Sequence, residues 1–268
     1  MDDRDEKLRR GSSFGAVAAA YSEHRPNYPD EAIRWCLAPA ATSAAVDISA
    51  LKVLDLGAGT GKLTLQLTGI VGGVTAVEPD QAMLAELTRL VPSVPAFLGS
   101  AESIPLPDAS VHAVVCGQSL HWFNLDLALP EIARVLVPGG VLGAMWNSDD
   151  DRVDWVAGLQ AAAEGAASPS LSNRRPEAAG FAVAVGGDGG ERYFTPSVNA
   201  EFPNAQRRTA DSMVATIATH SRFLIMEPER RDRVLAQVRD YLSARPETSA
   251  GEFTLPMVTS VIRAIKRP

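Results

Sequence analysis

A glycine-rich segment, "VLDLGAGTGK" at residues 53–62, carries the clearest chemical signal in the sequence. Its glycines, Gly57, Gly59 and Gly61, follow an apolar stretch typical of a strand and precede a stretch typical of a helix. Glycine lets the backbone approach a ligand closely, and a helix N-terminus offers unpaired amide groups and the positive end of the helix dipole. The segment therefore predicts a ligand site where a strand meets its helix, at the carboxyl edge of a sheet.

The spacing of this segment tests two ligand classes. A nucleoside-triphosphate loop has the pattern G-x-x-x-x-G-K-[ST], but the distance from Gly57 to Lys62 is one residue short. Leu63 also stands where the magnesium-binding hydroxyl would be. A dinucleotide fingerprint, G-x-G-x-x-G, has Lys62 at its third glycine and fits weakly, so it stays open.

Two further groups of polar residues follow predicted strands. Glu78 ends the strand in "VTAVEPD", where a carboxylate can accept hydrogen bonds from ribose hydroxyls; the alternative is a surface acid that caps a helix. In "VVCGQSLHWFN", residues 114–124, an apolar run stops at Gln118, Ser119 and His121. We expect these side chains to project from the same sheet edge, although His121 would equally suit a residue that holds the backbone there.

The elements that position these residues alternate between strand and helix, which predicts a parallel sheet with right-handed crossovers. Strands are expected at residues 51–56, 72–80, 94–102, 109–119 and 141–147. Helices are expected at 63–68, at 81–90 with Asp80 as N-cap, and at 124–140, where Pro-Gly-Gly closes the helix.

The flanking regions are less regular. Before the sheet we expect a tail at 1–11, a helix starting at Ser12 or Ser13, and a helix at 31–37 capped by Asp30. After it we expect a helix at 155–165, a long loop at 167–192, a strand at 199–206, helices at 212–226 and 228–242, and a strand at 253–265. The predicted organisation is one domain, with an N-terminal cap at 12–47, a ligand-binding half at 48–147 and a substrate side at 148–268.

These pieces together resemble one enzyme family. "VLDLGAGTG" resembles motif I of the class I S-adenosylmethionine-dependent methyltransferases, and Glu78 has the family's second-strand position. "GSAESIPLPDAS", "LPDASVHAVVCGQSLHW" and "EIARVLVPGGVLGAMWN" are similar to the motifs that follow, in the right order, over residues 50–147. The resemblance implies an α/β, Rossmann-like fold: a seven-stranded, mostly parallel sheet with helices on both faces and an N-terminal helical cap.

The resemblance also implies roles for individual residues. Asp55 and the three glycines would hold the amino-acid end of S-adenosylmethionine. Ala101 would offer a backbone amide, and Glu102 a carboxylate near the adenine. Gln118 and Ser119 would line the cofactor, and His121 would line cofactor or substrate space.

The N-terminal stretch "SFGAVAAAYSEHRPNYP" resembles a small-molecule subgroup, the trans-aconitate-type or type 11 methyltransferases. In that pattern Tyr21 and Arg25 reach the carboxylate of the cofactor or close over it; alternatively, Tyr21 packs the cap and Arg25 is a solvated turn residue. A planar guanidinium suits a carboxylate because it donates two parallel hydrogen bonds.

The implied activity is methyl transfer to O, N or C of a small molecule. A base is needed only where the acceptor must lose a proton, and His121 and His220 are the candidates. His220 would equally be an ordinary helix histidine. One alternative is a non-methylating reaction in the same fold, such as cyclisation. A second is a nicotinamide-dependent oxidoreductase, although the catalytic Tyr-x-x-x-Lys pattern is missing. A third is a non-enzymatic binding module.

Composition limits the remaining classes. A net charge of −7 argues against binding to a nucleic-acid backbone. The chain has no apolar run of about 18 residues and no secretory signal pattern, so we expect a cytoplasmic protein without membrane or metal partners. Cys36 and Cys116 are expected to be buried, reduced thiols. The acceptor and the oligomeric state do not follow from the sequence.

Overall fold

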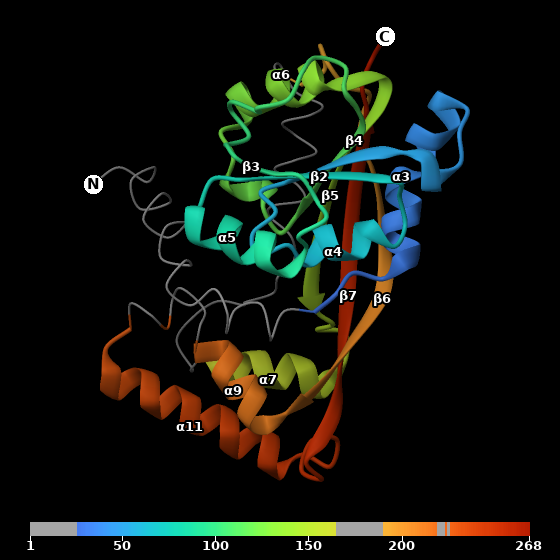
Figure 1. The fold of residues 1–268 in the computed structure, drawn as a ribbon. Coiled ribbons are helices and arrows are strands. Elements are labelled where there is room, and N and C mark those ends of the chain that lie inside the picture. Colours follow the sequence, from blue (N-terminus) through green and yellow to red (C-terminus); the bar gives the residue numbers. More distant parts are fainter. Residues whose placement is uncertain (1–25, 165–189, 219–222, 224–225) are drawn as a thin grey trace.

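The computed structural model describes residues 26–164, 190–218, 223 and 226–268 (Figure 1). Its centre is a seven-stranded sheet with the order β3-β2-β1-β4-β5-β7-β6. Each strand is parallel to its neighbours except β7, which runs antiparallel to β5 and β6. The strands are β1 (Lys52–Leu56), β2 (Gly73–Glu78), β3 (Ala96–Leu98), β4 (Val111–Gly117), β5 (Leu136–Asp149), β6 (Val198–Thr209) and β7 (Glu252–Ile265). The predicted mostly parallel sheet is confirmed.

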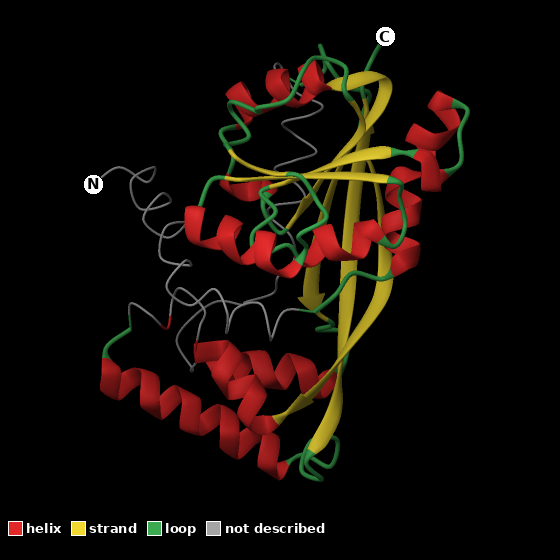
Figure 2. Cartoon of the chain, viewed as in Figure 1, coloured by secondary structure: helices red, strands yellow, loops and turns green. Residues whose placement is uncertain are grey.

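Helices cover both faces of this sheet, as predicted (Figure 2). One face packs against α3 (Asp30–Ala44), α4 (Lys62–Thr68) and α5 (Gln81–Leu90), and the other against α6 (Leu125–Val135). Short 3-10 turns, η2 (Ile48–Ala50) and η3 (Leu120–Trp122), precede β1 and α6. Adjacent strand residues such as Val53 and Leu54 belong to opposite cores, because successive side chains in a strand point to opposite faces.

A further helical layer lies beyond the carboxyl end of β5. It consists of α7 (Asp154–Glu164), α9 (Ala210–Ala218) and α11 (Pro228–Ala244), which pack on one another. Their apolar core also includes Phe253 and Leu255 of β7, because β6 and β7 extend past the other strands. The part of the predicted helix 212–226 beyond Ala218 lies largely outside the described residues.

Two predicted boundaries are wrong. Asp30 is the first residue of α3 rather than its N-cap, which is Pro29. The Pro-Gly-Gly segment does not close a helix: α6 ends at Val135, and the segment lies inside β5. There Gly139 has a φ of 73°, and the register with β4 shifts, so the strand absorbs these residues as a bulge. The predicted Asp80 cap of α5 is confirmed by its bonds to the backbone N–H groups of Ala82 and Met83.

The C-terminal part of the region predicted as a cap lies directly on the sheet. The buried side of α3 contacts β5, and an added Cβ at Gly143 would come within 2.1 Å of the Cys36 Sγ atom. Cys36 and Cys116 are both buried, unbridged thiols, as predicted. The earlier part of this region and most of the predicted loop at 167–192 lie outside the described residues. No described helix is both long and apolar enough to cross a membrane.

Candidate functional site

The glycine loop connects β1 to α4, and its three glycines have positive φ angles of 68°, 58° and 87°. An added Cβ at Gly57 would lie 2.6 Å from the Ser119 Cβ, and one at Gly61 would lie 2.8 Å from the Leu87 Cγ. These two glycines therefore allow the loop to pack closely on its neighbours. At Gly59 the nearest atom would be the Met83 Sδ at 3.9 Å, so only Gly59 presents an open backbone face to a ligand.

Asp55 lies in β1 just before this loop and is 1% exposed. Its Oδ2 atom accepts a hydrogen bond of 2.6 Å from the Thr64 hydroxyl, whereas its Oδ1 atom is buried and has no hydrogen-bond partner among the described residues. Burial raises the pKa of Asp55 to about 7, and the charge of Glu78 adds to the effect. A buried acceptor without a donor fits a ligand that brings an N–H or O–H group, such as the amino group of S-adenosylmethionine.

Glu78 ends β2 and is buried, at 5% exposure. Its Oε2 accepts the backbone N–H of Gly59 at 2.8 Å, and its Oε1 accepts that of Asp80 at 2.9 Å. The alternative of a surface capping acid is therefore wrong, because Asp80 caps α5 itself. Burial raises the pKa of Glu78. A carboxylate has about four acceptor positions, so Glu78 can hold the glycine loop and still accept ligand hydroxyls.

Gln118 and Ser119 follow β4 at the same sheet edge. Gln118 has a φ of 59°, which is uncommon outside glycine, and its Nε2 donates to the Asn147 carbonyl at 3.0 Å. Strained residues of this kind persist where the surroundings hold them and cluster at functional sites. The buried Ser119 hydroxyl donates to the Leu56 carbonyl at 2.8 Å, so this side chain joins β4 to β1.

The other predicted site residues of this half have structural contacts. The Nδ1 atom of His121 accepts a long hydrogen bond of 3.5 Å from the Trp146 indole, which is a contact between side chains and not with the backbone. Glu102 accepts the backbone N–H of Asn124 at 2.8 Å, next to the start of α6, and the side chain of Ala101 is buried. Tyr21, Arg25 and His220 lie outside the described residues.

The structure adds a group that the sequence did not reveal, here called the amide cluster: Asn147 on β5, Asn204 on β6 and Thr259 on β7. The Asn204 Nδ2 lies 2.8 Å from the Asn27 carbonyl, 3.0 Å from the Asn147 Oδ1 and 3.1 Å from the Thr259 Oγ1. Asn147 also donates to the carbonyls of Pro26 and Asn27, both at 3.3 Å. The cluster therefore fixes the segment before α3 across the sheet. No sequence signal joins these residues, because only the register of β5, β7 and β6 brings them together.

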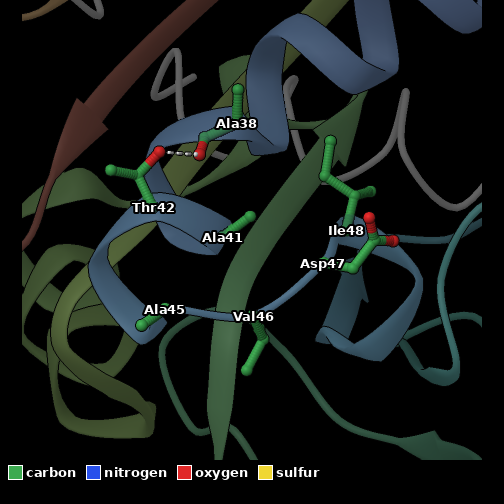
Figure 3. Close-up of a pocket in the computed structure, with 7 residues that line it drawn as sticks. All are labelled: Ala38, Ala41, Thr42, Ala45, Val46, Asp47 and Ile48. Atoms are coloured by element: carbon green, nitrogen blue, oxygen red, sulfur yellow. Dashed lines mark hydrogen bonds between the residues drawn. The ribbon is translucent and has the colours of Figure 1, made fainter.

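A depression of about 600 Å³ lies elsewhere, at the end of α3 (Figure 3). Its lining is mostly small or apolar, and its one charged side chain, Asp47, accepts the backbone N–H of Ser49 at 2.8 Å. Its last lining residue, Ile48, begins η2, which comes just before β1. The depression therefore lies near the amino end of β1, whereas the glycine loop follows the carboxyl end of that strand. This depression has no reactive group, so the candidate site is the carboxyl edge. The described residues contain no cluster of His, Cys, Asp or Glu suited to a metal ion.

Comparisons with known proteins agree with this geometry. Residues 54–144 match the family model of a methyltransferase domain. An uncharacterized methyltransferase of Mycobacterium bovis is 36% identical over 261 residues, covering 94% of this chain and 95% of the relative. The demethylmenaquinone methyltransferase of Chlorobaculum tepidum is 38% identical over 92 residues, or 33% of this chain and 38% of that protein. A solved structure from Anaeromyxobacter dehalogenans, described as a type II methyltransferase, has a TM-score of 0.60 at 24% identity and covers 90% of this chain and 97% of its own.

Proposed function

Because the chain belongs to the class I S-adenosylmethionine-dependent methyltransferases, we propose that it transfers a methyl group from S-adenosylmethionine to a small molecule. The observation that carries the cofactor assignment is the buried Oδ1 of Asp55, which has no donor among the described residues and belongs to the strand that leads into the loop of Gly59. Oxygen, nitrogen and carbon all remain candidate acceptor atoms. A partial likeness, 32% identity over 142 residues, to a protein of Rubrivivax gelatinosus named as a ubiquinone/menaquinone biosynthesis C-methyltransferase supports keeping carbon among them.

We assign the cofactor to four groups at the carboxyl edge. Asp55 would accept a hydrogen bond from its amino group, Gly59 would let it approach the backbone, Glu78 would accept from its ribose hydroxyls, and Gln118 would lie beside it. When bound, S-adenosylmethionine supplies a methyl group on a positively charged sulfur that leaves as a neutral thioether. The work of the protein is then mainly alignment, which contributes at most about 7–11 kcal/mol to lowering a barrier.

The remaining assignments extend the same proposal to the adenine and to the N-terminal segment. Ala101 and Glu102 would lie near the adenine, with Ser119 lining the edge, and Tyr21 and Arg25 would reach the cofactor from the N-terminal side. The structure gives Glu102 and Ser119 other hydrogen bonds, to Asn124 and Leu56. These bonds do not exclude a ligand, because carboxylate and hydroxyl oxygens have further acceptor positions.

Titration calorimetry with S-adenosylmethionine, S-adenosylhomocysteine and NADH tests the proposal. We expect micromolar binding of the two sulfur compounds and no binding of NADH. Gly59→Val should abolish binding, because a side chain would occupy the open face. Gly251→Val is the matched control: Gly251 also has a positive φ, of 105°, with nothing within 4 Å of an added Cβ. Binding of NADH, or unchanged affinity in Gly59→Val, would contradict the assignment.

A further inference from the structure

Asp149 is the last residue of β5 and lies on the same sheet face as the amide cluster. It pairs with Met257 of β7, which pairs in turn with Asn204 of β6. Directly paired residues in a ladder have side chains on one face, and so do residues two apart in a strand, such as Asn147 and Asp149. At about 3.3 Å per residue, Asp149 lies about 7 Å beyond Asn147 along the strand.

The side chain of Asp149 is half-buried at the end of β5. The β5 arrow points toward the layer of α7, α9 and α11 (Figure 1), whose core side chains include Leu159, Val214 and Val238. Arg208 of β6, 4% exposed, is the charged group that acts on Asp149 among the described residues. Its guanidinium donates to the Ser212 carbonyl at 2.5 Å and to the Thr216 hydroxyl.

The Asp149 carboxylate accepts no hydrogen bond from the described residues, and Arg208 acts on it through its charge. Removal from water raises the pKa of Asp149 to about 6, and this effect outweighs the opposite effect of Arg208. Such a carboxylate is ionised at neutral pH, retains unused acceptor positions and is a stronger base than an exposed aspartate. Groups whose pKa is shifted toward the working pH are candidates for proton transfer when they lie at a binding site.

Asp149 also lies at the sheet edge where we place the cofactor. Gln118, which follows β4, donates to the backbone of Asn147, two residues before Asp149. The carboxyl ends of β4 and β5 are therefore joined at this point, where ligands bind in open α/β sheets. His121 suits a base less well, because its Nδ1 atom already accepts the Trp146 N–H group.

We propose that Asp149 accepts the proton of an O–H or N–H nucleophile on the small-molecule acceptor, which selects oxygen and nitrogen among the candidate acceptor atoms. The inference rests on the proposed methyl transfer. A bond forms between the nucleophilic oxygen or nitrogen and the methyl carbon as the carbon–sulfur bond breaks, and sulfur keeps that electron pair. The electron pair of the O–H or N–H bond stays on the nucleophile, and the proton moves to the Asp149 carboxylate.

The test compares Asp149→Asn, which keeps the shape of the side chain, with Asp151→Asn as a neighbouring control. S-adenosylhomocysteine affinity is measured first by calorimetry, and both variants should match the wild type within about twofold. Failure of the wild type to bind contradicts the proposed function. If all three proteins bind S-adenosylhomocysteine normally, a negative result in the activity assay below contradicts the inference about Asp149 and not the cofactor assignment.

Methyl transfer from methyl-labelled S-adenosylmethionine to a panel of phenols and primary amines is then followed between pH 5 and 8. The wild-type rate should rise with pH up to about 6 and then level off, since the carboxylate must be ionised. Asp149→Asn should lower kcat at least about 100-fold, which is the usual scale for the loss of a general base. The variant should also lack the rise of the rate with pH. A variant rate within threefold of the wild type overturns the inference.

A second readout does not depend on the acceptor. Carbon-13 NMR of labelled aspartate carboxyls, in the S-adenosylhomocysteine complex, identifies Asp149 by the signal that Asp149→Asn lacks. A midpoint near pH 6 supports the inference, and a midpoint near 4, typical of a hydrated carboxylate, overturns it. If no panel compound is methylated, this titration decides the matter.

Discussion

Asp55→Asn should stabilise the cofactor-free protein at pH 8 while abolishing cofactor binding. The pKa of Asp55 is about 7, against 3.8 for an ordinary aspartate carboxyl, because burial disfavours the charged form. A raised pKa means that the folded state binds the proton more tightly than the unfolded state does. Stability is therefore highest at low pH and is lost as the pH rises through 7, by about 4 kcal/mol in total.

Asparagine cannot ionise, so the variant escapes this loss. Its amide nitrogen would occupy the position of Oδ1, which has no described partner, at a cost of about 1–3 kcal/mol. The expected net gain at pH 8 is about 1–3 kcal/mol. The cost of the amide does not depend on pH, so the advantage of the variant should grow by about 2–3 kcal/mol between pH 5 and pH 8.

Urea unfolding of wild type and Asp55→Asn at pH 5 and pH 8, without cofactor, measures both quantities. Asp240→Asn, at an exposed position of α11, is the control and should stay within about 0.5 kcal/mol of the wild type at both pH values. If the difference in the free energy of unfolding between the variant and the wild type does not grow with pH, burial does not raise the pKa of Asp55 as described. Wild-type affinity of the variant for S-adenosylhomocysteine would separately refute its role in binding.

Two further predictions concern contacts that only the structure reveals. Gly143→Ala should lower the free energy of unfolding by about 1–3 kcal/mol, because its Cβ would lie 2.1 Å from the Cys36 Sγ. Thermal melting should show this loss, and Cys36→Ala in the same protein should partly restore the melting temperature. An unchanged melting temperature in Gly143→Ala would contradict the close packing. Asn204→Ala should cost about 1–2 kcal/mol in urea unfolding through the lost bonds to the Asn27 carbonyl and the amide cluster, whereas Asn199→Ala, exposed on the same strand, should have no effect. Equal effects of the two asparagine variants would rule out a special role for the amide cluster.

Local sequence determined the central part of the fold. Alternation of apolar and amphipathic segments over residues 51–147 predicted β1, β2, β4 and the helices between them, because burial of one face imposes the period of each element. Asp80 was identified as an N-cap by its side chain and position, since capping involves only the next few residues. The glycine loop was identified for the same reason: its positive φ angles are a local property.

The limits of local reasoning appear at β5. Pro-Gly-Gly was interpreted as the end of a helix, yet these residues continue into the strand as a bulge, because pairing with β4 and β7 outweighs their weak strand preference. Likewise, Glu78 was recognised as a carboxylate at a strand end, but the sequence did not show that it holds Gly59.

The acceptor side depended on tertiary structure throughout. The antiparallel register of β5, β7 and β6 places Asn204 against Asn147 and brings Arg208 near Asp149. None of these residues belongs to a local motif, and the members of each pair, Asn204 with Asn147 and Arg208 with Asp149, lie more than 50 positions apart in the chain. The neighbours of Asp149 come from strands that follow it in sequence, Met257 of β7 by pairing and Arg208 of β6 by charge. The sequence by itself determined where the glycine loop and its strand lie, because a loop motif is local. Only the fold determined the surroundings of Asp149, because burial and strand register are properties of the whole chain.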